Sequence, residues 1–393
     1  MSDGDTARAV NLTEEPTRAE SQRPALITGG AGFIGSNVAN RLLASGQRVI
    51  LYDNLSRNGV GRNVTWLRET YGDRVEVVVG DIRDFDLLRQ TVERAGQVFH
   101  FAAQVAVTSS LLDPIEDFNI NARGALNLLE SIRATAHRPP LLFTSTNKVY
   151  GALDDVELTK ERQRYRVADP RIADAGIDES RPLDCHSPYG CSKGTADNYI
   201  IDYSRSFGLR AVVFRMSCIY GPRQCGTEDQ GWVAHFLIRA LERKPVTLYG
   251  DGCQVRDILF VDDLINAMLL AQANVDRLSG QAFNIGGGPQ HTVSLRELLD
   301  LISEMNRGRL HVEMKGWRTG DQRYYVSNTA KFSRATGWMP TVDVRTGVYR
   351  LYEWLAAARG IARRPRRPNS RTPFVPASND AHETETLATD GAA

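Results

Sequence analysis

Short apolar runs alternate with helix-like segments along the first 220 residues of the chain. The runs are four to seven residues long, which is typical of buried strands. They are Ala25–Thr28, Arg48–Asp53, Val75–Gly80, Val98–Ala102, Leu141–Thr144 and Ala211–Ser217. Helical periods lie between them, for example in Asn37–Ala44 and Asp117–Ala134. Alternation of this kind makes βαβ units, so the chain is predicted to have an α/β fold with a parallel sheet.

The strict alternation weakens after about Gly221, where a second region begins. Its elements are the helical patterns Trp232–Arg243, Asp262–Ala273, Ser294–Met305 and Val344–Ala358, with short strands such as Val246–Tyr249 among them. We therefore expect a sheet domain at residues 24–220 and a smaller lobe at residues 221–358 that closes over the sheet.

Three further stretches lack a clear apolar period. Residues 153–179 are charged and are predicted to form a long surface loop inserted into the sheet domain, where such loops often act as lids or interfaces. Residues 1–23 are polar, and residues 359–393 carry a basic cluster followed by Pro, Ser, Thr and acidic residues. Both ends are predicted to be disordered tails.

The bulk composition argues against several classes of protein. Lys and Arg number 48 and Asp and Glu number 47, so the net charge of +1 gives no reason to expect nucleic acid or a membrane surface as a partner. No apolar run approaches the ~20 residues that cross a bilayer, and the N-terminus has no apolar signal-peptide core. The five cysteines include no C-x-x-C pair, and the histidines are scattered, so no metal site is predicted. These features predict a cytoplasmic protein with reduced thiols.

A glycine-rich turn follows the first predicted strand and opens the first predicted helix. Gly29, Gly32 and Gly35 have the spacing G-x-x-G-x-x-G. In a strand–turn–helix unit, one glycine makes the tight turn, the next lets backbone N–H groups approach a pyrophosphate, and the last lets the helix pack closely on the strand. Phe33 and Ile34 lie at the helix N-terminus, whose free N–H groups and positive dipole end favour phosphates. The turn predicts a dinucleotide-binding Rossmann domain.

The end of the second strand indicates which dinucleotide binds. Asp53 lies 18 residues after Gly35 and is followed by Asn54. A carboxylate at this point accepts hydrogen bonds from ribose hydroxyls and repels a 2′-phosphate. NAD is therefore expected as the cofactor, while the nearby Arg57 keeps NADP open as an alternative.

The ends of the third and fourth strands are expected to contact the same cofactor. Asp81 and Ile82 follow the third strand, where an acidic group can meet an adenine amino group. Ala102 and Ala103 end the fourth strand, where small side chains let a dinucleotide lie across the sheet edge. Ligands of doubly wound sheets bind outside the carboxyl ends of the strands, where these residues are predicted to lie.

Tyr189 and Lys193 lie four residues apart in a predicted helix, so they share one face of it. A free tyrosine has a pKa of about 10, too high for a base at neutral pH. The Lys193 ammonium and a positively charged nicotinamide ring would both lower that pKa. Thr146, after the fifth strand, supplies a hydroxyl that can hold the same substrate oxygen. The trio predicts reversible hydride transfer in which Tyr189 takes the hydroxyl proton.

These motifs, in their order along residues 24–358, resemble the extended short-chain dehydrogenase/reductase family. The string Asn121-Ala122-Arg123-Gly124 fits the same pattern. The resemblance implies a Rossmann doubly wound parallel sheet with a smaller C-terminal substrate-binding lobe, and it implies that Asn121 lies near the cofactor. Members act mostly on nucleotide-activated sugars as epimerases, dehydratases, decarboxylases or reductases. They commonly pair through a helix bundle, so a homo-oligomer is expected.

The residues after Thr146 separate activities within this family. Its sugar dehydratases typically have Thr-Asp-Glu there, and the Asp and Glu protonate and remove water. This chain has Asn147 and Lys148 instead, so elimination lacks its acid and base. The sequence therefore favours epimerisation, in which hydride leaves a ring carbon and returns to the other face of a keto intermediate.

Three local strings, residues 145–151, 184–194 and 228–233, resemble the CDP-paratose 2-epimerase (CDP-tyvelose epimerase) group. This resemblance implies that C2 of the sugar is oxidised by bound NAD. A C2–H beside no carbonyl is not acidic, so simple deprotonation would not epimerise that carbon. A UDP-sugar 4-epimerase, an NDP-sugar 4,6-dehydratase and a non-catalytic NAD-binding protein stay open as alternatives.

The resemblance also implies where a nucleotide-sugar substrate, CDP- or UDP-linked, would bind. Arg256 and Arg318 match positions that hold the nucleotide diphosphate in similar epimerases, and an arginine fork donates two parallel bonds to such groups. Asp321 could accept from the nucleotide ribose. Cys218 stands where similar enzymes often have Asn, and a thiol cannot donate as an amide does. The remaining expected substrate contacts are Asn147, Lys148 and Gln224.

Overall fold

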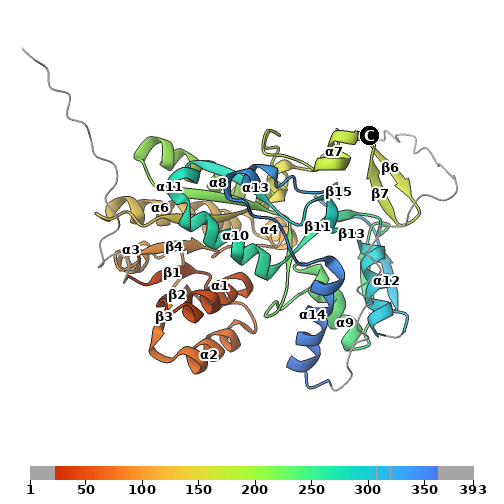
Figure 1. The fold of residues 1–393 in the computed structure, drawn as a ribbon, viewed down its shortest axis with the longest axis horizontal. Coiled ribbons are helices and arrows are strands. Elements are labelled where there is room, and N and C mark those ends of the chain that lie inside the picture. The colour runs from red at the N-terminus through yellow and green to blue at the C-terminus, as the bar shows by residue number, and fades with distance from the viewer. Residues whose placement is uncertain (1–22, 307, 319, 362–393) are drawn as a thin grey trace, which may run out of the picture.

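The computed structural model describes residues 23–306, 308–318 and 320–361. The two predicted disordered tails fall almost entirely outside these residues. Within them, the chain forms a sheet domain and a second group of helices and strands that packs beside it (Figure 1).

Seven parallel strands form the main sheet, in the order β12-β8-β5-β4-β1-β2-β3. In chain order they are β1 (Ala25–Thr28), β2 (Val49–Asp53), β3 (Val75–Val79), β4 (Gln97–His100), β5 (Leu141–Thr146), β8 (Ala211–Met216) and β12 (Gln281–Ile285). Strands β2 and β3 are added on one side of β1, and the later strands on the other side, starting with β4. The strand order thus reverses between β1 and β4, and their carboxyl ends flank the crevice that binds ligands in doubly wound sheets. The predicted α/β fold with a parallel sheet is confirmed.

Helices cover both faces of this sheet. One face packs against α1 (Phe33–Ala44), α2 (Val60–Tyr71) and α10 (Val261–Ala273), and the other against α3 (Phe85–Val92), α6 (Gly124–Ala134) and α8 (Ser187–Phe207). Side chains alternate between the two cores along each strand. In β1, for example, Ala25 and Ile27 belong to the first core and Leu26 to the second.

A third core lies at the lower right of Figure 1, between α9 (Trp232–Leu241), α12 (Leu295–Asn306) and α14 (Val344–Ala358). Strands β10 (Val246–Tyr249) and β14 (Val312–Lys315) pair beside it. A small sheet joins β11 (Val255–Phe260) to β9 (Cys218–Tyr220), β13 (Thr292–Ser294) and β15 (Tyr324–Tyr325). Two short helices, α11 (Val275–Leu278) and α13 (Ala330–Thr336), complete this half of the chain.

Helix α10 and strand β12 come from residues 221–358 but pack with the main sheet. The division into domains at residue 220 stays a prediction. Periodicity could not assign β12, because a five-residue apolar run looks the same whether it joins a large sheet or a small one.

Residues 153–179, predicted to form a long surface loop, contain regular structure instead. Strands β6 (Leu158–Glu161) and β7 (Arg164–Val167) form an antiparallel hairpin, and α7 (Pro170–Ala175) follows. The sequence does not predict the hairpin because half of its ten residues, 158–167, are charged. Its apolar face nevertheless packs on the second half of the chain, where Tyr165 is buried beside Cys253 and Val255.

The helix predicted over Asp117–Ala134 is interrupted. Helices α4 (Val107–Leu112) and α5 (Pro114–Phe118) come first, and a π-helical turn at Asn119–Arg123 leads into α6. Such turns insert one residue per turn and often mark functional sites. Here the turn contains Asn121, whose buried side chain bonds to neighbouring segments.

Candidate active site

The glycine turn after β1 lies against the end of β4. Gly29 has a left-handed backbone with φ of +68°, and a Cβ there would come 2.7 Å from the Ala102 nitrogen. A Cβ on Gly35 would come 2.4 Å from the Gly29 carbonyl oxygen. Side chains at either position would force the turn away from the sheet, so the backbone requires glycine at both.

The N-terminus of α1 fits a diphosphate. Gly32 is the residue before the helix, and no side chain caps it. The first N–H groups of the helix, from Phe33 onward, therefore have no side-chain acceptor and remain suited to an anion. Together with the close approach of Gly29 and Gly35 to their neighbours, this geometry fits the predicted dinucleotide.

Asp53 holds the glycine turn from the end of β2. Its carboxylate accepts hydrogen bonds from the Ala31 N–H at 3.0 Å and the Leu55 N–H at 2.9 Å. Burial raises the pKa of Asp53, while these N–H groups and Arg57 lower it. Each oxygen of the Asp53 carboxylate can accept one more hydrogen bond, so the carboxylate can still accept from a ribose hydroxyl as predicted. Arg57 donates to Gln230 at 2.6 Å and so joins the β2 loop to the second half of the chain.

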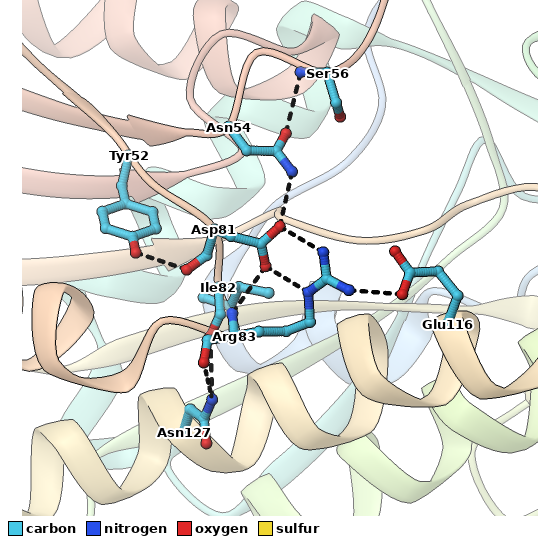
Figure 2. Close-up of polar contacts among 8 residues, drawn as sticks. All are labelled: Tyr52, Asn54, Ser56, Asp81, Ile82, Arg83, Glu116 and Asn127. Carbon is cyan, nitrogen blue, oxygen red and sulfur yellow. Dashed lines mark hydrogen bonds and ion pairs between the residues drawn. The ribbon is translucent and has the colours of Figure 1, made fainter.

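Asp81 lies among polar groups at the end of β3 (Figure 2). Arg83 binds both of its carboxylate oxygens at 2.8 Å, and Asn54 donates to one of them at 3.0 Å. These bonds from Arg83 hold the pKa of Asp81 well below its usual range. Glu116 pairs with the same guanidinium at 2.6 Å. The carboxylate is thus already paired, and its contact with adenine stays a prediction.

The other predicted cofactor residues line the same sheet edge. Ile82 is buried beneath Gly124, where a Cβ would come 2.6 Å from the Ile82 side chain. Ala102 and Ala103 are partly exposed after β4. Asn121 accepts from the Gln104 N–H at 2.9 Å, so its amide is already engaged within the protein.

Tyr189 and Thr146 meet where α8 begins beside the end of β5. The side chains of Tyr189 and Thr146 lie close enough for Thr146 to influence the pKa of Tyr189. Burial raises the pKa of Tyr189 to about 12, and Thr146 and Arg57 act in the lowering direction. The two hydroxyl-bearing side chains thus lie near each other, the phenol is protonated at neutral pH in this state, and their shared catalytic role stays a prediction.

Lys193 lies deeper in the same helix. Its ammonium donates to the Thr144 carbonyl at 2.6 Å and lies 4.2 Å from the centre of the Phe143 ring. Burial lowers the pKa of Lys193 to about 7, while Asp197 and Asp117 raise it. In this structure the ammonium is thus directed at the sheet backbone, and its expected action on Tyr189 stays a prediction.

The residues expected to bind substrate form two groups. In the first, the end of β5 meets residues 320–322: Asn147 donates to Gln322 at 3.2 Å, and Lys148 donates to the Gly320 carbonyl at 3.0 Å. Arg256 pairs with Asp321 at 2.9 Å in the same group. Burial and Arg256 lower the pKa of Lys148 to about 8.

The second group lies on the loop before α9. Arg318 pairs with Asp229 at 3.2 Å and Glu228 at 3.5 Å, and its guanidinium lies 3.7 Å from the centre of the Tyr249 ring. Gln224 donates to the Ile219 carbonyl at 3.1 Å, while its side-chain oxygen is buried without a hydrogen-bond partner. Arg318 is thus neutralised by carboxylates that a diphosphate would have to displace.

Sequence reasoning missed several polar residues that the fold brings to this site. Asp117 and Ser192 are buried and hydrogen-bonded to each other beside Lys193. Gln322 and Gln254 contact residues that are expected to bind the substrate. A single polar residue inside a helical pattern carries no signal of its partner. The adjacency of Gln322 to Asp321 was the one available hint.

Within the described ranges, no three His, Cys, Asp or Glu side chains are placed to hold a metal ion. Among the helices that the structure describes, none is both long and apolar enough to span a bilayer.

Comparison with known proteins identifies the family. The model of the NAD dependent epimerase/dehydratase family matches residues 25–286, and the chain belongs to this family. CDP-paratose 2-epimerase of Salmonella typhi is 42% identical over 339 residues, covering 84% of this chain and 99% of the relative. UDP-glucose 4-epimerase of Mycolicibacterium smegmatis is 31% identical, covering 84% of this chain and 97% of the relative.

A solved structure supports the same assignment. UDP-glucose 4-epimerase of Thermus thermophilus, in complex with NAD, has a TM-score of 0.70 and 32% identity, and covers 85% of this chain and 99% of its own. The chain is an NAD-dependent enzyme of the epimerase class. The expected cofactor, NAD, is confirmed.

Proposed function

We propose that this enzyme epimerises C2 of a CDP-linked sugar, in the manner of CDP-paratose 2-epimerase. The observation that carries the proposal is the proximity of Tyr189 to Thr146 at the carboxyl end of β5, followed by Asn147 and Lys148 where a dehydratase needs carboxylates. The 42% identity to the Salmonella typhi enzyme supports the choice of nucleotide and carbon.

The hydroxyl pair and Lys193 account for the proton chemistry. When bound, NAD supplies a reversible hydride acceptor with a positively charged ring. Thr146 and Tyr189 hold the reacting sugar hydroxyl, and Tyr189 takes its proton during oxidation and returns it during reduction. A pKa of about 12 is too high for this task even with Arg57 acting to lower it, so Tyr189 requires further positive charge, and we assign that role to the Lys193 ammonium.

The groups after Thr146 oppose elimination. Asn147 is neutral and donates to Gln322 at 3.2 Å, and Lys148 carries an ammonium that donates to Gly320. Neither can act as the carboxylic acid that protonates a leaving hydroxyl. Both can donate hydrogen bonds to sugar oxygens, which is the substrate role proposed for them.

The phosphates of the substrate require cations. We assign this role to Arg256 and Arg318, with Asp321 accepting from the ribose and Gln224 lining the site. The unpartnered oxygen of Gln224 supports a bound donor there, because a buried oxygen without a partner costs about 1–3 kcal/mol. The cofactor contacts proposed from sequence are those at the glycine turn, Asp53, Asn54, Asp81, Ile82, Ala102, Ala103 and Asn121.

A panel of nucleotide sugars tests the substrate assignment. The purified chain is incubated with CDP-paratose and with UDP-glucose, and the product stereochemistry is determined by NMR. We expect inversion at C2 of the CDP-sugar and at least about tenfold lower kcat/KM for the UDP-sugar, equivalent to ~1.4 kcal/mol. Inversion of UDP-glucose alone, at C4, would establish the 4-epimerase alternative, and release of a 4-keto-6-deoxy sugar would establish a dehydratase.

We further propose that two copies of the chain associate through α4 and α5. Leu112, Ile115 and Phe118 are 88%, 75% and 52% exposed on these helices, so large apolar side chains face solvent together. The family resemblance implies pairing through helices. The same two helices pack on α8, which carries Tyr189.

The Ile115→Arg variant tests this surface. We expect it to run as a monomer in light scattering after gel filtration, because a buried arginine without a partner opposes association. Met339→Arg replaces another exposed apolar residue, far along the chain, and should leave the assembly unchanged. A variant at Ile115 that keeps the wild-type mass would refute the α4–α5 interface.

A further inference from the structure

Asp117 is a carboxylate buried inside the sheet domain. It lies on α5, is 1% exposed, and accepts from the Ser192 hydroxyl at 2.5 Å and from Asn121 at 3.2 Å. Asn121 also donates to the Ser192 hydroxyl at 3.0 Å, which closes a three-membered ring of hydrogen bonds. Among the described residues Asp117 has no ion-pair partner within 4 Å. Its charge is therefore not cancelled by a salt bridge.

This ring joins the helix that carries Tyr189 and Lys193. Ser192 lies between them on α8, and its hydroxyl is 3.2 Å from the Tyr189 carbonyl oxygen. The Tyr189 N–H, one of the donors that a helix start leaves free, donates to Ser110 of α4 at 3.1 Å. Helices α4 and α5 thus fix the first turn of α8 from one side.

The surroundings of Lys193 contain few charges. On α8, Asp197 is bound by both arms of Arg215 at 2.9 Å, so most of its charge is already matched. On β4, burial lowers the pKa of His100 to about 3, so that ring is neutral at physiological pH. Strand β5 contributes the Thr144 carbonyl and the Phe143 ring. Asp197 and Asp117 both raise the pKa of Lys193, Asp197 more strongly, but only Asp117 is without a salt bridge among the described residues.

We propose that Asp117 is a positioning residue for epimerisation: its carboxylate anchors the start of α8 through Ser192 and supplies the counter-charge that keeps Lys193 an ammonium. The proposal rests on the catalytic roles given above to Tyr189 and Lys193. In this proposal the protonated Lys193 lowers the pKa of Tyr189. Without the Asp117 carboxylate, Lys193 would lose its proton more readily and Tyr189 would be a weaker base, although Asp117 itself does not contact the substrate.

The effect of Asp117 on fold stability distinguishes this positioning role from a purely structural one. Burial is the largest influence on Asp117 and raises its pKa, so the ionised carboxylate destabilises the fold. That destabilisation is absent below the pKa of the unfolded chain, grows as pH rises from that value to the higher folded pKa, and is complete above the folded pKa. An asparagine could make similar hydrogen bonds without the charge, so stability alone would favour it.

The Asp117→Asn variant of the full chain, loaded with NAD, tests the proposal. We expect kcat for CDP-paratose to fall about 10- to 100-fold, with KM and bound NAD unchanged. The descending alkaline limb of the kcat profile should move about one pH unit lower, because Lys193 loses its proton more readily without the anion. The melting temperature should equal or exceed that of wild type at pH 7.5, and this difference should vanish near pH 4.

Two further variants make the result decisive. Asp202→Asn removes an exposed carboxylate from the same helix and should leave rate and profile unchanged. Ser192→Ala removes the hydroxyl link and should lower kcat severalfold, so it tests the anchor even if Asp117→Asn fails to fold. A lower melting temperature with an unmoved alkaline limb would show that Asp117 is structural and would overturn the proposal. Full activity of Tyr189→Phe would instead overturn the proposed function itself.

Discussion

The Tyr189→Phe variant is expected to lose about 10³-fold in kcat while keeping its fold and its bound NAD. The substitution removes one oxygen from the start of α8 and leaves the ring in place. That oxygen lies near Thr146, and it is the group proposed to take the proton from the sugar hydroxyl. Without it, the hydroxyl proton has no nearby acceptor, so the ring carbon cannot be oxidised at a useful rate.

Rates are measured by NMR with CDP-paratose, and NAD is measured by its release on denaturation. Tyr199→Phe is the matched control, because Tyr199 lies on the same helix and is 46% exposed. It should turn over at the wild-type rate. Unchanged turnover by Tyr189→Phe would remove the proposed base and would favour the non-catalytic alternative.

The Gly35→Ala variant is expected to lose most of its bound NAD and several degrees of melting temperature. A Cβ at Gly35 would lie 2.4 Å from the Gly29 carbonyl and 2.7 Å from the Gly30 Cα, and backbone atoms there cannot rotate aside as a side chain would. Relieving the overlap must push α1 away from β1, at a cost of about 1–3 kcal/mol. The same movement takes the helix N-terminus out of reach of the diphosphate.

Gly61→Ala provides the control for this loss. A Cβ at Gly61 meets no atom within 4 Å, and the residue lies inside α2. Alanine should therefore leave NAD binding unchanged and stabilise the fold by about 0.5–1 kcal/mol. If purified Gly35→Ala still carried stoichiometric NAD, the binding of the diphosphate at the start of α1 would not depend on the close packing of Gly35 against Gly29 and Gly30.

The sequence predicts well those parts of the fold that a short stretch of neighbouring residues determines. Strands β1, β2 and β3 are mainly apolar runs next to turn residues, and their ends agree with the structure within one residue. The turn at Gly29–Gly35 is equally local, since its spacing reports both the tight turn and the close helix contact.

The parts that escape prediction depend on partners distant in sequence. The hairpin β6–β7 is charged, and only its contact with Cys253 and Val255 reveals an apolar face. Within the site, spacing placed Tyr189 and Lys193 on one helix face, but it could not show that the Lys193 ammonium is directed at Thr144. Asp117 is 75 residues from Ser192, so no pattern could connect them.

The most direct test of the central claim uses CDP-paratose labelled with deuterium at C2 and follows the label by NMR in ordinary water. If the ring carbon is oxidised and then reduced within one closed site, the epimerised product keeps deuterium at C2. A product that instead carries solvent hydrogen at C2 would mean that the carbon was deprotonated, and the roles given to Tyr189 and NAD would be wrong.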